Sequence, residues 1–171
     1  MQDLDQRQDR EKMEAILMAE SVGYLGLCRG GDPYVVPVNY AYVDGTILFH
    51  CGATGKKTDY ISENPRVCFS VGRQLGDVRD HGGAGACHVD NDSVLCYGAA
   101  RILDDLEERA RALNLFNRRY HPEAEDLTFD RIPNCTVVEI RVAEMTGRQE
   151  RERKHTHWDH VFATETQVVP R

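Results

Sequence analysis

The amino-acid sequence predicts an α+β fold in which six antiparallel strands form a β-barrel with a few flanking helices. Short strand-like runs follow one another through turn residues, without the regular alternation of strand and helix that builds a parallel sheet. Asp44-Gly45 lies between two such runs and is a strong hairpin signal, because a type I′ turn needs the positive φ that glycine accepts. We expect a closed or nearly closed barrel, since closure removes sheet edges that invite aggregation.

The N-terminal third of the chain predicts one helix followed by a three-stranded meander. Met13, Ile16 and Leu17 fall on one face of a helix expected over residues 9–20. Pro37 has no N–H for a sheet ladder, so we expect it at an edge or a bulge. The strands of the meander are expected at residues 22–28, 34–43 and 46–51.

The rest of the chain predicts two more helices and three more strands. A short helix opens within residues 52–57 and ends before Asn64-Pro65. Asp104 is the expected cap of a longer helix, with Glu107 at its third position, and Gly98 marks a bend within a strand. The strands are expected at residues 67–71, 93–103 and 136–142, with a glycine-rich loop over 72–92 and a charged, His-rich tail over 149–171.

Length and composition indicate one globular domain that neither spans a membrane nor binds nucleic acid. The chain has 171 residues, with 28 acids against 21 bases and a formal net charge of −7. No apolar run reaches the roughly 18 residues of a membrane span, and an acidic chain is unsuited to broad contact with nucleic-acid phosphates. The polar N-terminus does not read as a secretion signal, so we expect a cytoplasmic protein. We expect a single domain over residues 1–171, with its core at about 8–148.

The segment after the third strand has the features of a phosphate cradle. Glycines permit a tight turn at residues 52–55, and the N–H groups and positive dipole end of the helix start favour an anion. Thr54 and Gly55 supply a hydroxyl and a turn, while Lys56 and Lys57 add charge. The spacing is not that of a Walker loop. A solvated loop that only caps a helix remains the alternative.

Polar groups on neighbouring strands suggest a surface beside this cradle that can contact a flat ring. Val38, Asn39 and Tyr40 lie on the strand paired with the one that ends at His50, and the Asn39 amide both donates and accepts. His50 can donate a hydrogen bond, carry a proton, or be an ordinary strand histidine. Taken one by one, these residues also fit plain strand positions.

We predict no metal site and no hydrolase site. The six cysteines form no CxxC pair and are expected to be reduced thiols. Cys87-His88 with His81 lack a second close pair of ligands. The HTHWDH run resembles a metal cluster, but it lies in a charged tail, where adventitious binding or plain solvation is expected. Trp158 either packs over a ligand or partner or anchors the tail. Because no catalytic serine, paired-carboxylate or dinucleotide motif is present, a bound organic cofactor is expected to carry any chemistry.

A series of short motifs runs through residues 8–148 in an order more specific than any one of them. The motifs are Gln8-Asp9-Arg10-Glu11, Gly23-Tyr24-Leu25, Pro33-Tyr34-Val35-Val36-Pro37-Val38-Asn39-Tyr40, Asp44-Gly45, His50, Gly55-Lys56-Lys57, Asn64-Pro65-Arg66-Val67-Cys68-Phe69, Ala86-Cys87, Ser93-Val94, Tyr97-Gly98-Ala99-Ala100-Arg101 and Glu144-Met145-Thr146-Gly147. In this order the chain resembles the flavin-binding split-barrel superfamily. Within it, the nearest group is the nitroimidazole-resistance (Nim) proteins, which are related to pyridoxamine 5′-phosphate oxidase.

The resemblance implies a homodimeric six-stranded split barrel with FMN, or alternatively FAD, in clefts at the dimer interface. It places Val38, Asn39 and Tyr40 along the flavin ring and His50 beside it as a candidate proton donor. It places Thr54, Gly55, Lys56 and Lys57 at the phosphate. The implied activity is flavin-mediated reduction of a small acceptor, such as a nitroaromatic, a nitroimidazole or a quinone, with NAD(P)H as a candidate electron donor.

Two departures from the family pattern bear on the substrate. Cys87 and Ser93 match family positions, but His88-Val89-Asp90 follows Cys87 where the family commonly has a tryptophan and then a basic or aromatic stretch. The C-terminal residues with which pyridoxamine-phosphate oxidases read their substrate are not visible, which disfavours that reaction. The alternatives are a flavin- or heme-binding protein of this fold without turnover, and an enzyme like pyridoxamine-phosphate oxidase.

Overall fold

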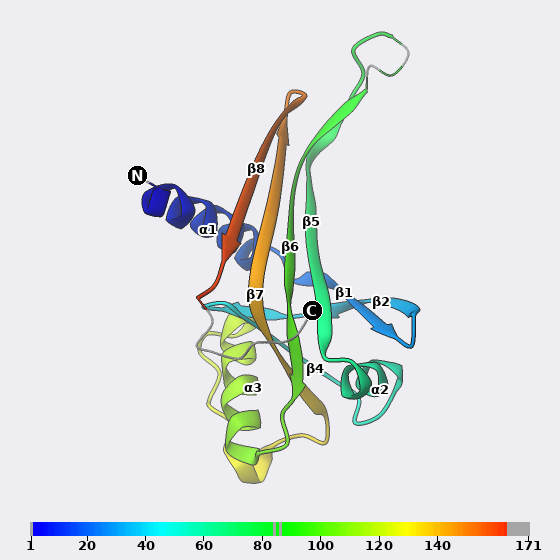
Figure 1. Cartoon of the computed structure of the whole chain (residues 1–171). Coiled ribbons are helices and arrows are strands. Elements are labelled where there is room, and N and C mark those ends of the chain that lie inside the picture. The colour runs from blue at the N-terminus through cyan, green and yellow to red at the C-terminus, as the bar shows by residue number, and fades with distance from the viewer. Residues whose placement is uncertain (1, 84, 86, 164–171) are drawn as a thin grey trace.

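The computed structural model describes residues 2–83, 85 and 87–163, with the backbone alone for residues 2–7 and 129. The chain has an α+β fold with an antiparallel sheet and a few helices (Figure 1). The helices are α1 (Gln2–Ala19), α2 (Lys56–Glu63) and α3 (Leu106–Tyr120), with a short 3-10 turn, η1 (Phe129–Arg131). The strands are β1 (Val22–Arg29), β2 (Asp32–Asn39), β3 (Ala41–Val43), β4 (Thr46–Cys51), β5 (Arg66–Arg79), β6 (His88–Ile102), β7 (Thr136–Arg151) and β8 (Lys154–Val161).

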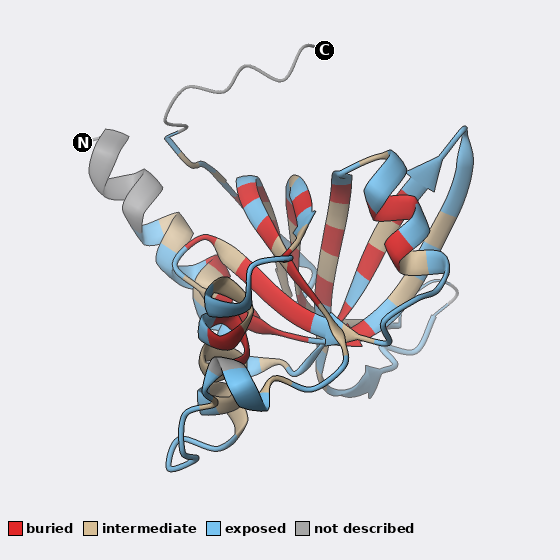
Figure 2. Cartoon of the chain, turned by 90° about the horizontal axis from the view of Figure 1, so that it is seen from below, coloured by how far each residue is buried: buried red, intermediate tan, exposed pale blue. Residues whose placement is uncertain are grey.

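The eight strands form one open sheet, where the sequence predicted six strands in a closed or nearly closed barrel. The order is β2-β1-β5-β6-β7-β4-β3, and β8 pairs with β7. One reason for the higher number is that the strand expected over residues 34–43 breaks at Tyr40. As a result β2 pairs with β1 at one end of the sheet, and β3 pairs with β4 at the other. Seen from below, the strands stand in an arc with buried residues along them (Figure 2).

The glycine-rich loop and the His-rich tail expected from the sequence are largely strands. β5 continues to Arg79 and β6 begins at His88, so only residues 80–87 connect them. β7 continues to Arg151 and β8 follows it, while residues 164–171 of the expected tail lie outside the described part. The outer parts of these four strands project beyond the rest of the molecule (Figure 1). We call this projection the arm and define it as residues 72–83, 85, 87–92 and 148–158.

A buried carboxylate holds the base of the arm together in place of an apolar core. Asp92 is 1% exposed. Its two oxygens accept from Arg73 on β5 and from Arg151 and Gln149 on β7, at 2.8–3.2 Å. Two guanidinium groups on one carboxylate offset its desolvation, and they hold the pKa of Asp92 below its usual range although burial alone would raise it. Polar strands can therefore pair here, which a search for apolar runs misses.

Two apolar clusters lie on opposite faces of the sheet. The larger one includes Met13, Ile16 and Leu17, which confirms the expected apolar face of α1. The smaller one packs α3 against the other face through Leu48, Leu103, Ala112, Leu113 and Val137. Since successive strand residues alternate between faces, Phe49 belongs to the first cluster and Leu48 to the second.

Several local predictions are confirmed, and one cap is displaced by a residue. Asp44 and Gly45 have φ of 41° and 79°, as a type I′ turn requires. Pro37 lies on β2, an end strand of the sheet, and the register shifts between Tyr97 and Gly98, where a bend was expected. The cap of α3 is Asp105 and not Asp104, because the Asp105 side chain accepts from the Glu108 N–H at 2.9 Å.

The structure also bears on membranes and thiols. None of the helices in the described part is long and apolar enough to cross a bilayer. All six cysteines are free thiols.

Trp158 is buried and packs at Gly147, where an added Cβ would lie 2.9 Å from the Trp158 ring and 2.8 Å from Met13. Trp158 therefore anchors β8 against β7 and α1.

Candidate functional site

The segment between β4 and α2 forms an open turn, and no side chain caps the backbone N–H groups where α2 begins. Gly55 caps α2 with φ 147° and ψ 175°, a conformation that strains any residue with a Cβ. No side chain caps the helix, and a Cβ placed at Gly55 would meet nothing within 4 Å. The N–H groups of a first helical turn have no intrahelical acceptor. This end of α2 is therefore open to an anion, whereas α3 satisfies its own end with Asp105.

Hydrogen bonds to carbonyl groups fix the shape of the turn. The Thr58 hydroxyl donates to the Gly55 carbonyl at 2.7 Å, and the Asp59 N–H reaches the same oxygen at 3.2 Å. The Thr136 hydroxyl of β7 donates to the Ala53 carbonyl at 3.1 Å. Thr54 is exposed. Because these contacts use carbonyl oxygens, they leave the N–H groups of the turn available.

The two lysines of the cradle lie in different surroundings. The Lys56 ammonium is 3.9 Å from a carboxylate oxygen of Asp32 and lies over the rings of Tyr34 and Tyr60. Lys57 is half-buried, and its charge acts on the thiol of Cys51 at the end of β4. Burial raises the pKa of that thiol, and the Lys57 charge opposes the rise. The structure therefore places the Lys57 charge on the β4 side of the turn.

Val38 and Tyr40 do not present their side chains to the surface. Both are buried in the larger apolar cluster, and the Tyr40 hydroxyl donates to the Leu17 carbonyl at 2.6 Å. Burial raises the pKa of Tyr40 well above its ordinary value. Asn39 is exposed, and its amide donates to the Ser21 carbonyl at 3.1 Å. Only the Asn39 side chain and the backbone of this run are therefore accessible to a ligand.

His50 is exposed at the end of β4 and borders an aromatic row on α3. Its ring makes an edge contact with Phe116 at 4.9 Å, and Phe116 lies 5.0 Å from Tyr120. The Tyr120 hydroxyl donates to the Tyr40 carbonyl at 2.7 Å. Ala41 pairs with Leu48, and Asn39 and His50 lie two residues beyond that pair on their own segments. The row thus links His50 to the Asn39–Tyr40 end of β2.

Sequence reasoning did not single out Phe116 and Tyr120, which border the candidate site. The signal was present, because Leu113, Phe116 and Tyr120 continue one face of the helix. Leu113 is buried, but Phe116 and Tyr120 are only partly buried. The sequence pattern of a helix does not show which end of its apolar face borders a site, because that depends on where the helix packs on the sheet.

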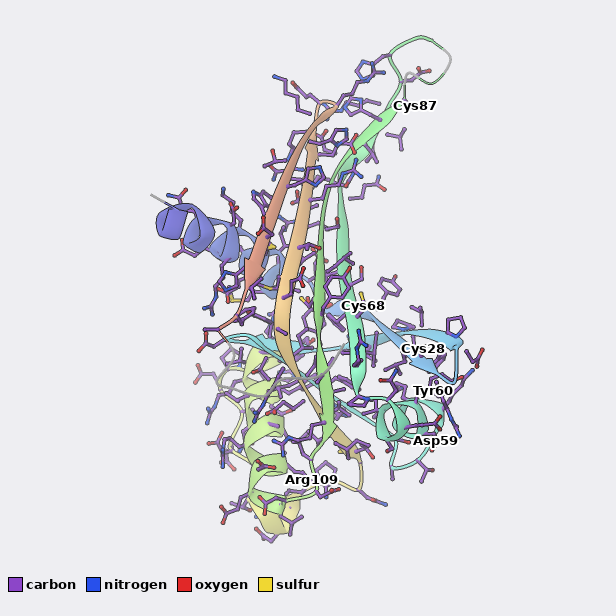
Figure 3. The ribbon with its side chains drawn as sticks, viewed as in Figure 1. Cys28, Asp59, Tyr60, Cys68, Cys87 and Arg109 are labelled. Carbon is purple, nitrogen blue, oxygen red and sulfur yellow. The ribbon has the colours of Figure 1, made fainter. Side chains whose placement is uncertain are left out.

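The other residues singled out by sequence lie elsewhere. Cys87 is at the far end of the arm, whereas Tyr60 and Asp59 mark α2 at the opposite end of the molecule (Figure 3). His81 and His88 stack near Cys87, with Nε2 of one 2.6 Å from Nδ1 of the other. Within residues 2–83, 85 and 87–163, no three His, Cys, Asp or Glu side chains gather as metal ligands.

Comparison with known proteins identifies the family. The model of the pyridoxamine 5′-phosphate oxidase family matches residues 9–149. The chain therefore belongs to that family, and the resemblance seen in the sequence is confirmed. A curated relative, an uncharacterised protein of Rhizobium meliloti (strain 1021), is 32% identical over 62 residues. That match spans 36% of this chain and 40% of the relative.

Solved structures share the fold. A candidate 5-nitroimidazole antibiotic resistance protein from Bacteroides thetaiotaomicron is 27% identical, with a TM-score of 0.70 over 82% of this chain and 83% of that one. An FAD-binding protein from Mesorhizobium loti is 25% identical, with a TM-score of 0.60 over 82% and 94% of the two chains. A flavocytochrome from Azotobacter vinelandii is 20% identical, with a TM-score of 0.70 over 95% and 80%, and this likeness shows the fold alone.

Proposed function

We propose that the chain binds a flavin and reduces a small acceptor, such as a nitroaromatic, a nitroimidazole or a quinone. The observation that carries the proposal is the uncapped start of α2, with its open Gly55 and the Lys56-Lys57 pair in its first turn. These groups fit a phosphate monoester, which favours FMN, with FAD as the alternative. The family, and the likeness to an FAD-binding protein of the same fold, support the proposal.

Each part of the site has a role in this proposal. Thr54, Gly55 and lysine charge from the Lys56-Lys57 pair hold the phosphate, while Asn39 and the backbone at Val38 and Tyr40 border the ring. A bound flavin supplies hydride-transfer chemistry that protein side chains do not. The exposed His50 imidazole carries a proton at the site, and Phe116 limits the orientation of that ring. NAD(P)H is the proposed electron donor, and the cytoplasm the proposed compartment.

A second copy of the chain is the proposed partner. The outer face of β1, β2, β5 and β6 exposes large apolar side chains: Val22, Tyr24, Val35 and Tyr97 are 40–65% exposed. Tyr24 pairs with Pro37 and Ser70 on the neighbouring strands, which makes the surface continuous. A contiguous apolar patch on a sheet marks an interaction surface. We propose that a homodimer covers it.

The first test of the proposal is the visible absorption spectrum of the freshly purified protein, before and after adding FMN. Flavin bands, with FMN released on denaturation, are the expected result. A colourless protein that refuses FMN contradicts the proposal, and a Soret band favours heme instead. Reduced protein mixed with a nitroaromatic or a quinone then separates turnover from storage, because a storage protein is reoxidised no faster than free reduced FMN.

The role of His50 is tested by His50→Ala in the flavin-loaded protein. A positioned proton donor contributes about 10²-fold or more, so turnover is expected to fall by that factor. Retained flavin absorbance shows that the loss is not a loss of cofactor. Unchanged turnover removes His50 from the reaction.

A further inference from the structure

The Lys56 side chain lies against the β1–β2 hairpin. Its ammonium is 3.9 Å from the Asp32 carboxylate and lies 4.7 Å and 5.1 Å from the ring centres of Tyr34 and Tyr60. The two rings pack edge to face at 5.3 Å. One acidic and two aromatic partners attract an ammonium together, by ion pairing and by cation–π contact. Asp32 and Tyr34 belong to β2, so Lys56 joins the first turn of α2 to that strand.

Asp32 is fixed from a second direction. The Tyr60 hydroxyl donates to the same carboxylate oxygen, Oδ2, that Lys56 approaches, and this contact raises the pKa of Tyr60. Arg29, at the other side of the hairpin turn, pairs with Glu63 at the end of α2 at 2.6 Å. Both ends of α2 are thus tied to the β1–β2 hairpin.

Lys57 has no such engagement. Among the described residues, no hydrogen bond, ion pair or ring contact is seen for its ammonium, and its charge acts on the Cys51 thiol. Neighbouring residues of a helix point about 100° apart, so one lysine can face the hairpin while the next faces the end of β4. An ammonium that lies against Asp32 and two aromatic rings is less available to a phosphate at the start of α2 than the unengaged ammonium of Lys57.

We propose that the two lysines have separate roles, and that Asp32 separates them. Lys57 supplies the side-chain charge for the phosphate, whereas Lys56 docks α2 on the hairpin and its charge is neutralised by Asp32. Asp32 is a positioning residue in this arrangement, because it acts on the phosphate site only through Lys56. The inference rests on the proposed flavin function, since it assigns roles within the same cradle.

The test compares FMN with riboflavin, which lacks the phosphate. Dissociation constants of both ligands are measured by flavin fluorescence for the full chain, and their ratio isolates the phosphate contribution. Lys57→Gln is expected to lower the preference for FMN about tenfold or more, as loss of a charged hydrogen bond does. Lys56→Gln is expected to leave the preference within about twofold and to lower the melting temperature. Lys154→Gln is the control, because it removes one positive charge on β8 in the arm, outside the cradle.

Asp32→Asn tests the positioning role directly. It keeps the shape of the side chain and releases Lys56, so the FMN preference is expected to rise about threefold, as one further cation near the phosphate in a watery site provides. An equal loss in Lys56→Gln and Lys57→Gln overturns the separation of roles, and an unchanged preference in Asp32→Asn overturns the role of Asp32. Wild-type protein that binds neither ligand refutes the proposed function itself.

Discussion

At the scale of single residues, glycine has two separate uses in this chain. Gly55 opens the candidate phosphate turn, whereas Gly98 lets β6 pass close to β7: a Cβ at Gly98 would lie 2.1 Å from the Arg141 carbonyl oxygen. Backbone of a paired strand cannot move aside cheaply, so Gly98→Ala is expected to lower the free energy of unfolding by about 2–3 kcal/mol, at the upper end of overpacking costs. Urea denaturation at neutral pH measures the change.

Gly72→Ala is the matched control for this substitution. Gly72 lies on neighbouring β5, and its added Cβ would meet only the Asp92 carbonyl at 3.9 Å, an ordinary contact. Its effect is expected to stay within about 0.5 kcal/mol, as for substitutions away from tight packing. Equal losses in the two variants would show that the close approach at Gly98 does not matter. The bend at Gly98 was predictable from sequence, but its cause, the backbone of β7, was not.

At the scale of elements, β8 shows what sequence patterns leave out. It was expected to be part of a charged, His-rich tail. Its turn carries neither glycine nor asparagine, and Glu152 and Arg153 take the positive φ values of 47° and 68° themselves. The strand is nevertheless held against α1, which places Lys12 over Trp158 and Arg10 over Phe162. The signal that could have revealed it is the alternation around buried Trp158, whose neighbours His157 and Asp159 are exposed.

This packing makes β8 sensitive to acid through His160. Its Nδ1 is buried without a partner among the described residues, and its ring contacts Phe162 at 4.6 Å. Burial and then Arg10 lower the pKa of His160, while Glu14 and Asp159 oppose that shift. The folded state therefore binds the proton less well than the unfolded chain, whose histidines titrate near about 6.5. The stability that the neutral His160 imidazole contributes is fully present above that pH. The free energy of unfolding is therefore expected to fall as the pH drops from 7 to 5.

The matched comparison for this prediction uses two histidines of one strand. His160→Gln is expected to lose less unfolding free energy between pH 7 and pH 5 than the wild type, because the buried titrating group is gone. His157→Gln, at an exposed position, is expected to follow the wild type. Urea denaturation at both pH values measures the losses, and an identical loss in all three proteins would exclude a role for His160.

At the scale of the whole molecule, the fold class and most elements were predictable from the sequence. The arrangement of the candidate site was predictable only in part. Hairpin turns, helix faces and the order of motifs are local signals. The cradle is also local, since Thr54, Gly55 and the two lysines adjoin one another. What the sequence could not show is direction: Tyr40 points into the core, and Lys56 points to the hairpin. Such facts depend on which strands become neighbours.

The exposed face of β1, β2, β5 and β6 supports a prediction for the whole molecule. If a second copy covers this face, a charge at its centre must be desolvated without a partner, which is costly at an interface. Tyr24→Glu, flanked by Pro37 and Ser70, is therefore expected to weaken dimerisation about 100-fold or more and to yield monomer in size-exclusion chromatography with light scattering. Val78→Glu is the control, because Val78 is also an exposed apolar residue but lies on the arm. A wild type that is monomeric contradicts the homodimer, and a Tyr24→Glu variant that stays dimeric places the interface on another face.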